Sequence, residues 1–238
     1  MKEGILYGIG VGPGEPELIT LKALKRIQES DSIILPAEPK EECYAYLSVK
    51  EVWPEIEQKE IICLPFPMVR DKELLKKAQD TIYKKIKDLL LMGKKVGFLT
   101  IGDPSIYSTY SYIRKRMEQD NFAFETISGV PSFCAAAAAL GISLGENNQE
   151  IHIIPASYNI KESFLLTGTK VYMKSGKRLA ELKKELLALK ENNVYAVSNC
   201  GLPNEKHYYS AEELDEESGY LTIVVVKSMT QSGSQRRY

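Results

Sequence analysis

Short apolar runs alternate with amphipathic stretches up to Leu140, and this alternation predicts strands joined by helices. Runs with the length of buried strands lie at Ile5–Gly10, Ser32–Pro36, Ile61–Leu64, Lys95–Gly102 and Phe122–Ser128. Helices are expected after Pro16 with apolar positions from Leu18 to Ile27, from about Glu41 to Pro54, over Asp71–Met92, from Asp103, and over Pro131–Leu140. The order predicts an open, mostly parallel α/β sheet with ligands at the carboxyl ends of its strands.

A polar segment rich in glycine and asparagine, Gly141–Gln149, is followed by a second pattern of strands. We therefore predict two domains, residues 1–143 and 144–238. Strands are expected at Ile151–Ala156, Lys170–Lys174 and Tyr195–Cys200, with a helix over Arg178–Glu191. His207–Ser210 and Tyr220–Val226 have strand composition but leave no room for crossover helices, so the second sheet should end with antiparallel strands.

The composition is that of an ordinary globular protein, because 44% of the residues are hydrophobic. Lys and Arg number 31 against 32 Asp and Glu, which gives no indication of a nucleic-acid or anionic-membrane partner. The four cysteines are scattered without a Cys-x-x-Cys pair, so neither a zinc site nor a disulfide framework is expected. No apolar stretch approaches the ~18 residues of a membrane span and no signal segment is recognisable, so the expected location is the cytoplasm.

The loop after the first strand, Gly8–Gly14, invites comparison with two phosphate-binding loops and fits neither. The dinucleotide fingerprint needs a glycine where Pro13 or Glu15 stands, and a P-loop needs Gly-Lys-Ser/Thr where the chain has Gly14-Glu15-Pro16. A tight strand-to-helix turn, with glycines only for sharp backbone angles, remains an alternative interpretation.

Conventional catalytic sets are nearly absent, because the chain has only two histidines, His152 and His207. There is no His-Glu-x-x-His or Gly-x-Ser-x-Gly pattern, which argues against a metallohydrolase or an α/β-hydrolase. We predict no catalytic side chain and no metal ligand, and favour a reaction that needs little side-chain chemistry.

Further distinctive motifs stand at predicted strand ends. They are Leu99–Tyr110 with its Gly-Asp-Pro, Ile127–Leu140 with its run of alanines, Val171–Lys174, and Val197–Glu205. Each has a structural explanation: Asp103 can cap a helix, alanines allow close packing, and Asn-Cys-Gly can form a turn.

Taken together, these motifs resemble those of the tetrapyrrole methylases, which use S-adenosylmethionine. Gly10–Ala23 resembles the opening motif of that family, and the later motifs follow in the family's order over almost the entire chain. The resemblance implies cofactor-binding roles for Ile101, Gly102, Asp103, Ile106, Tyr107, Pro131, Ser132, Met173, Cys200 and Gly201. Pro131 departs from the threonine often found there, so a hydroxyl contact at this position is lost and can shift to Ser132.

The resemblance also implies two αβα domains with S-adenosylmethionine in the cleft between them, commonly as a homodimer. Tyr107–Tyr110 resembles in particular the branch that methylates C(20) of precorrin-2 or cobalt-factor II in cobalamin biosynthesis. The tetrapyrrole is expected over the first glycine loop, with its carboxylates on a cation. The substrate-binding residues are then Gly10, Gly12, Pro13, Gly14 and Arg70, with Lys22, Arg114 and Lys174 as further candidate cations.

Two alternatives stay open. One is another branch of the superfamily, which methylates a different ring carbon, a diphthamide precursor or ribosomal RNA. The other is a non-catalytic nucleotide-binding module.

Overall fold

The structure, a computed structural model, describes residues 4–67, 71–155, 159–189 and 193–227. The chain forms two compact units, residues 1–132 and 133–238. This division places nearly all of the alanine-rich helix with the second unit, whereas the predicted domains 1–143 and 144–238 placed it with the first.

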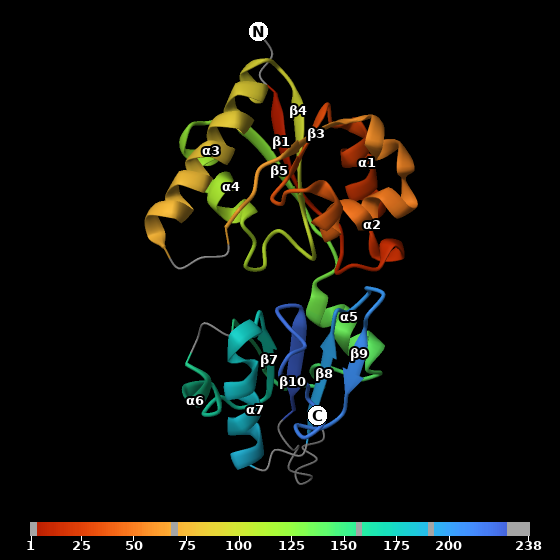
Figure 1. The fold of residues 1–238 in the computed structure, drawn as a ribbon, viewed down its shortest axis with the longest axis vertical. Helices are drawn as coiled ribbons and strands as arrows, with labels where there is room; N and C mark the ends of the chain where they lie inside the picture. Colours follow the sequence, from red (N-terminus) through yellow and green to blue (C-terminus); the bar gives the residue numbers. More distant parts are fainter. Residues whose placement is uncertain (1–3, 68–70, 156–158, 190–192, 228–238) are drawn as a thin grey trace. The chain divides into compact units, whose positions relative to one another are not determined.

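The first unit contains a sheet of five parallel strands in the order β3-β2-β4-β1-β5 (Figure 1). The strands are β1 (Ile5–Gly10), β2 (Ser32–Leu35), β3 (Glu60–Cys63), β4 (Lys95–Thr100) and β5 (Ala123–Ile127). The predicted parallel sheet is confirmed. Gly10 pairs with Thr100 and Ile9 with Ile127, so β1, β4 and β5 end at the same level and the loops that follow them meet.

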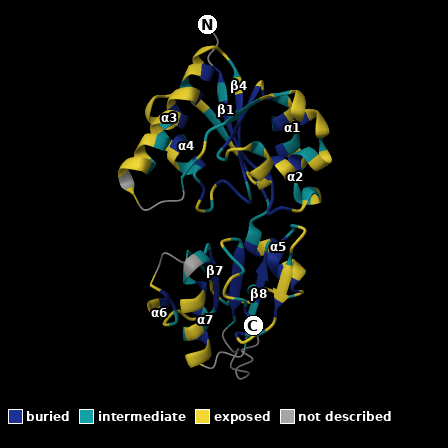
Figure 2. Ribbon diagram, in the orientation of Figure 1, coloured by how far each residue is buried: buried dark blue, intermediate teal, exposed yellow. Residues whose placement is uncertain are grey.

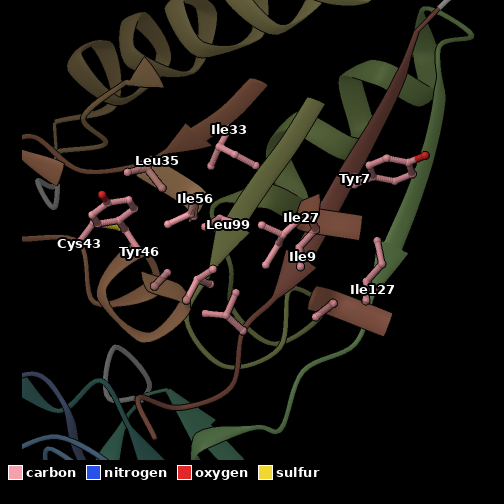
Figure 3. Packing of buried hydrophobic residues seen from close by; sticks show 14 residues of the cluster. Tyr7, Ile9, Ile27, Ile33, Leu35, Cys43, Tyr46, Ile56, Leu99 and Ile127 are labelled. Atoms are coloured by element: carbon pink, nitrogen blue, oxygen red, sulfur yellow. The ribbon is translucent and has the colours of Figure 1, made fainter. Parts of the chain in front are cut away.

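Helices cover both faces of this sheet, with α1 and α2 on one side and α3 and α4 on the other (Figure 1). They are α1 (Leu21–Glu29), α2 (Tyr44–Val52), α3 (Lys72–Leu91) and α4 (Tyr110–Gln119), with 3₁₀ turns at Pro16–Leu18, Lys40–Glu42 and Pro54–Gln58. Successive residues of a strand point to opposite faces of the sheet and therefore pack into two separate cores. Ile9, Ile33 and Leu99 pack with Ile27 and Tyr46 on the α1–α2 side (Figure 3).

The other core joins Leu6, Ile34 and Phe98 to Ile86 of α3 and Ile113 of α4. Each of these fully buried apolar side chains contributes about 1.5–3 kcal/mol of transfer free energy. The outer helix faces are exposed, whereas the strands are largely buried (Figure 2).

The predicted helix over Asp71–Met92 is confirmed by α3, which spans Lys72–Leu91. The Asp71 carboxylate caps this helix by accepting the amides of Glu73 and Leu74. Helix α1 begins later than predicted. Its cap is the Thr20 hydroxyl, which accepts the Ala23 amide at 3.1 Å. Ala23 and Ile27 form the buried face of α1, whereas Leu21 is 87% exposed and lies outside this face.

The expected helix start at Asp103 is wrong. Residues 103–107 form turns, and α4 begins only at Tyr110. The Asp103 carboxylate accepts the Ser105 amide as a cap would, but the chain then turns, and the Ser108 hydroxyl accepts the Tyr110 amide at 3.1 Å where α4 begins.

The second unit contains a mixed sheet in the order β6-β7-β10-β8-β9, in which β6 and β7 are parallel and the other pairs antiparallel. Its strands are β6 (Ile151–Pro155), β7 (Thr169–Met173), β8 (Val194–Ser198), β9 (Lys206–Tyr208) and β10 (Thr222–Val226). Its helices are α5 (Ser132–Ala139), the short α6 (Ile160–Ser163), which was not predicted, and α7 (Leu179–Ala188), which follows a 3₁₀ turn at Gly176–Arg178.

The core of the second unit lies between this sheet and α7, where Leu182 and Leu186 pack against Tyr172, Ala196 and Val224. The predicted antiparallel finish is confirmed. Among the described residues, no helix combines the length and apolar character that crossing a membrane requires.

Candidate functional site

The three glycine-containing loops after β1, β4 and β5 meet at the carboxyl edge of the first sheet. Gly12 and Gly102 form an isolated antiparallel bridge, in which the Gly102 amide donates to the Gly12 carbonyl at 2.6 Å and the Gly12 amide to the Gly102 carbonyl at 3.4 Å. Motifs that lie far apart in the sequence are thereby joined through their backbones.

Gly10 and Gly129 are glycines because the neighbouring backbones leave no room for a side chain. A Cβ on Gly129 would lie 2.2 Å from the Gly102 carbonyl oxygen, and one on Gly10 would lie 2.6 Å from the same atom and 2.7 Å from the Gly129 amide nitrogen. The space beside Gly10 is therefore filled by protein, so close approach of a ligand is not needed to explain this glycine. Gly12 has a left-handed backbone with φ of +82°, which independently favours glycine.

Gly102 differs from these two glycines because its missing side chain leaves open space. Its φ is +72°, and a Cβ built there would meet only the Ser132 amide nitrogen, at 3.9 Å. Gly102 itself is buried, and the space beside it is bounded by the amide nitrogen of Ser132, the first residue of α5.

Asp103 links two of the loops with its buried carboxylate. One oxygen, Oδ2, accepts the Gly129 amide at 3.1 Å, and the other, Oδ1, accepts the Ser105 amide at 2.7 Å and the Ser105 hydroxyl at 2.5 Å. Both oxygens therefore have protein donors, and their role in the site is to hold the loop after β5 against the loop after β4.

The remaining predicted residues of the first unit surround these loops. Ile101, Ile106, Pro131 and Ser132 are half-buried, and Tyr107 is 45% exposed. Tyr107 has φ of +47°, a strained conformation for an aromatic residue that is common at binding sites.

The first glycine loop, Gly10–Gly14, is buried. Pro13 and Gly14 are buried, and the Gly14 carbonyl accepts the Ser48 hydroxyl of α2 at 2.8 Å. The loop is therefore held in place by α2 as well as by Gly102.

The predicted residues of the second unit meet at one edge of its own sheet. Met173 ends β7, and Cys200 and Gly201 follow β8. Strand β10 lies between β7 and β8 and begins at this edge, where the Asn199 amide donates to the Leu221 carbonyl at 3.0 Å. Met173 and Cys200 are buried, whereas Gly201 is half-buried with φ of +75°.

Glu205 is a residue of this edge that the sequence interpretation did not single out. Its Oε2 accepts the Gly201 amide at 2.6 Å, and its Oε1 lies 2.5 Å from Nε2 of His207. Burial raises the pKa of the Glu205 carboxyl, but the bonds from Gly201 and His207 outweigh burial and leave the pKa below its usual value. The only sequence signal was its place at the end of the motif Val197–Glu205.

Two of the candidate cations for substrate carboxylates already pair with acids of the protein. The Lys22 ammonium lies 2.7 Å from Glu125, and the Arg114 guanidinium lies 3.0 Å from Glu118. Lys174 has a left-handed backbone with φ of +58°, and its Nζ lies 5.8 Å from the centroid of the Tyr220 ring. Burial lowers the pKa of the Lys174 ammonium. Arg70 lies outside the described residues.

The histidines do not form a catalytic set. His152 Nε2 lies 2.8 Å from the Thr167 carbonyl oxygen, in the second unit's first strand, and His207 lies against Glu205. Within the described ranges, no group of three or more His, Cys, Asp or Glu side chains is placed to hold a metal ion.

Comparison with known proteins identifies the class to which this fold and these loops belong. The model of the tetrapyrrole (corrin/porphyrin) methylases matches residues 5–215, so the chain belongs to this family.

Within the family, the chain is similar to enzymes named for one position of the macrocycle. It is 32% identical to a probable cobalt-precorrin-2 C(20)-methyltransferase of Methanocaldococcus jannaschii, over 93% of this chain and 95% of that protein. It is 28% identical to the cobalt-precorrin-2 C(20)-methyltransferase of Salmonella typhimurium, over 94% of this chain and 97% of that protein.

Solved structures share the fold. A cobalt precorrin-4 methyltransferase superposes with a TM-score of 0.72 at 20% identity, over 94% of both chains. Uroporphyrin-III C-methyltransferase of Thermus thermophilus, complexed with S-adenosylhomocysteine, superposes with a TM-score of 0.68 at 19% identity, over 94% of this chain and 97% of that chain.

Proposed function

We propose that the protein transfers a methyl group from S-adenosylmethionine to C(20) of precorrin-2 or cobalt-factor II in cobalamin biosynthesis. The observation that carries this proposal is the near-complete match to relatives named for C(20) methylation. The Tyr107–Tyr110 motif, which follows the Gly-Asp-Pro loop, supports the same branch.

The strand-end loops fit the cofactor. Gly102 offers an open backbone face beside the Ser132 amide, and the Asp103 carboxylate fixes the loops on either side of it. In the second unit, Met173, Cys200 and Gly201 lie together at a strand-end edge of the kind where α/β proteins bind ligands. We propose that the residues at these strand ends contact S-adenosylmethionine.

When bound, S-adenosylmethionine supplies a methyl group that its sulfonium has already activated. The nucleophile is an electron-rich carbon of the macrocycle, so the residues of the chain serve mainly to orient the two reactants and to exclude water. A reaction of this kind does not need a catalytic histidine set, and the two histidines of the described part of the chain do not form one.

The tetrapyrrole is proposed to lie over Gly10–Gly14, because this loop is bonded through Gly12 to the Gly102 loop proposed for the cofactor. Protein fills the space beside Gly10, and a Cβ on Gly12 would lie 3.0 Å from the Leu18 carbonyl oxygen, so contact with the macrocycle is assigned to the loop itself and not to space left by these two glycines. The two ligands would then meet where the loops after β1 and β4 meet.

Incubation with methyl-labelled S-adenosylmethionine tests the reaction. We expect carbon NMR of the product to show one labelled methyl group, on C(20), when either metal-free precorrin-2 or cobalt-factor II is supplied. Parallel incubations with the two substrates show which one is preferred, and uroporphyrinogen III serves as the control that should remain unlabelled. Label on any other ring carbon would place the chain in a different branch.

Single substitutions of the two histidines should have small effects. We expect His152→Ala and His207→Ala each to keep turnover within about tenfold of the natural chain, which corresponds to less than ~1.4 kcal/mol in the activation barrier. Steady-state rates measured on variants with natural circular dichroism spectra check this. A loss of several thousandfold would mean that a histidine acts directly in the reaction.

Family membership also motivates proposals on assembly and location. We propose a homodimer in the cytoplasm that binds the tetrapyrrole and no nucleic acid. Light scattering coupled to size exclusion measures the oligomeric state, and a monomer at micromolar concentration would contradict it.

A further inference from the structure

The loop after β8 has a demanding backbone. Asn199 and Gly201 both have left-handed conformations, with φ of +54° and +75°. The Leu202 amide donates to the Asn199 carbonyl at 2.9 Å and the Glu205 amide to the Leu202 carbonyl at 3.0 Å, so residues 199–205 fold back on themselves. A left-handed backbone is uncommon outside glycine, although asparagine adopts it more readily than most residues, and surrounding contacts help to hold it.

The side chain of Glu205 supplies such a contact from within the loop. Its Oε2 accepts the Gly201 amide at 2.6 Å, a short distance typical of a bond to a charged acceptor. An ionised carboxylate only accepts, so His207 donates from Nε2 to Oε1 and holds the carboxylate from the other side. Glu205 thus links Gly201 to the beginning of β9 (Lys206–Tyr208).

We infer that Glu205 is a positioning residue for the cofactor, which fixes the Cys200–Gly201 loop in its binding conformation through the Gly201 amide. The inference rests on the proposed function, because it takes this loop to contact S-adenosylmethionine. It has a chemical consequence: the Gly201 N–H is used within the protein, so other groups of the loop contact the cofactor.

Three variants separate this role from general stabilisation. Glu205→Ala removes both bonds. Glu205→Gln keeps a neutral oxygen that can accept the Gly201 amide. His207→Ala is the matched control, because it removes only the outer partner and leaves the bond between Glu205 and Gly201.

Two measurements are made on each variant: amide hydrogen exchange of residues 199–202 without ligand, and calorimetric affinity for S-adenosylhomocysteine. For Glu205→Ala we expect faster exchange at Gly201 and about tenfold weaker binding, the effect of losing one charge-assisted bond at a half-exposed site. Glu205→Gln should recover most of the affinity, and His207→Ala should stay within about threefold of the natural chain. In steady-state assays of Glu205→Ala, KM for S-adenosylmethionine should rise while kcat stays nearly constant.

Natural affinity in Glu205→Ala, or unchanged exchange at Gly201, overturns the inference. Should Glu205→Ala fail to fold, the folded Glu205→Gln variant decides: natural exchange at Gly201 together with a large loss of affinity would overturn the inference. Failure of the proposed function looks different: the natural chain itself would not bind S-adenosylhomocysteine, whereas the exchange difference at Gly201 would persist.

Discussion

Gly129→Ala is expected to lower the free energy of unfolding by about 3 kcal/mol and to abolish measurable binding of S-adenosylhomocysteine. The added Cβ would lie 2.2 Å from the Gly102 carbonyl oxygen and 2.8 Å from the Gly10 carbonyl carbon. Both neighbours are backbone atoms that the sheet and the bridge between Gly12 and Gly102 hold in place, so neither can move away without separating the loops.

Urea denaturation and calorimetry measure the two effects. Gly129 has no left-handed backbone, so the whole effect of its substitution is steric. Gly141→Ala is the complementary control, because Gly141 has φ of +66° but nothing within 4 Å of an added Cβ. It should cost about 1–2 kcal/mol for the backbone conformation alone and leave cofactor affinity intact. Equal effects of the two substitutions on affinity would show that contact between the three loops is irrelevant to binding.

Asp103→Ala is expected to weaken binding of S-adenosylhomocysteine about a hundredfold and to lower the free energy of unfolding by about 3 kcal/mol. The substitution removes the carboxylate that accepts hydrogen bonds from the Gly129 amide, the Ser105 amide and the Ser105 hydroxyl. The Gly129 amide would remain buried without a partner, and the loop after β5, which leads to Ser132, would lose its attachment to the loop after β4.

Ser105→Ala is the matched control, because it removes only the hydroxyl contact of Asp103 and leaves both amide bonds. We expect its affinity to remain within about threefold of the natural value. Natural affinity in the double variant Asp103→Ala, Met173→Ala would show that the cofactor does not bind at these loops.

Apolar runs determined the three central strands β1, β2 and β4, because a strand buried on both faces needs an uninterrupted apolar segment whatever its neighbours are. All five strands of the first sheet lie within two residues of their predicted bounds. Local chemistry likewise determined α3, whose cap is Asp71, and the short connection from His207 to Val226 required the antiparallel end of the second sheet.

Only the tertiary structure decided how side chains with several possible partners are used. Asp103 is a good helix cap in sequence, yet one oxygen of its carboxylate bonds the amide of Gly129, 26 residues away, and α4 begins only at Tyr110. Gly10 and Gly102 are both glycines, but neighbouring backbone fills the space beside Gly10 and leaves the space beside Gly102 open. Glu205 and His207 had no pattern that indicated their contact with each other or with Gly201. Local preference sets which elements form, whereas packing of distant segments determines which donor, acceptor or empty space each residue meets.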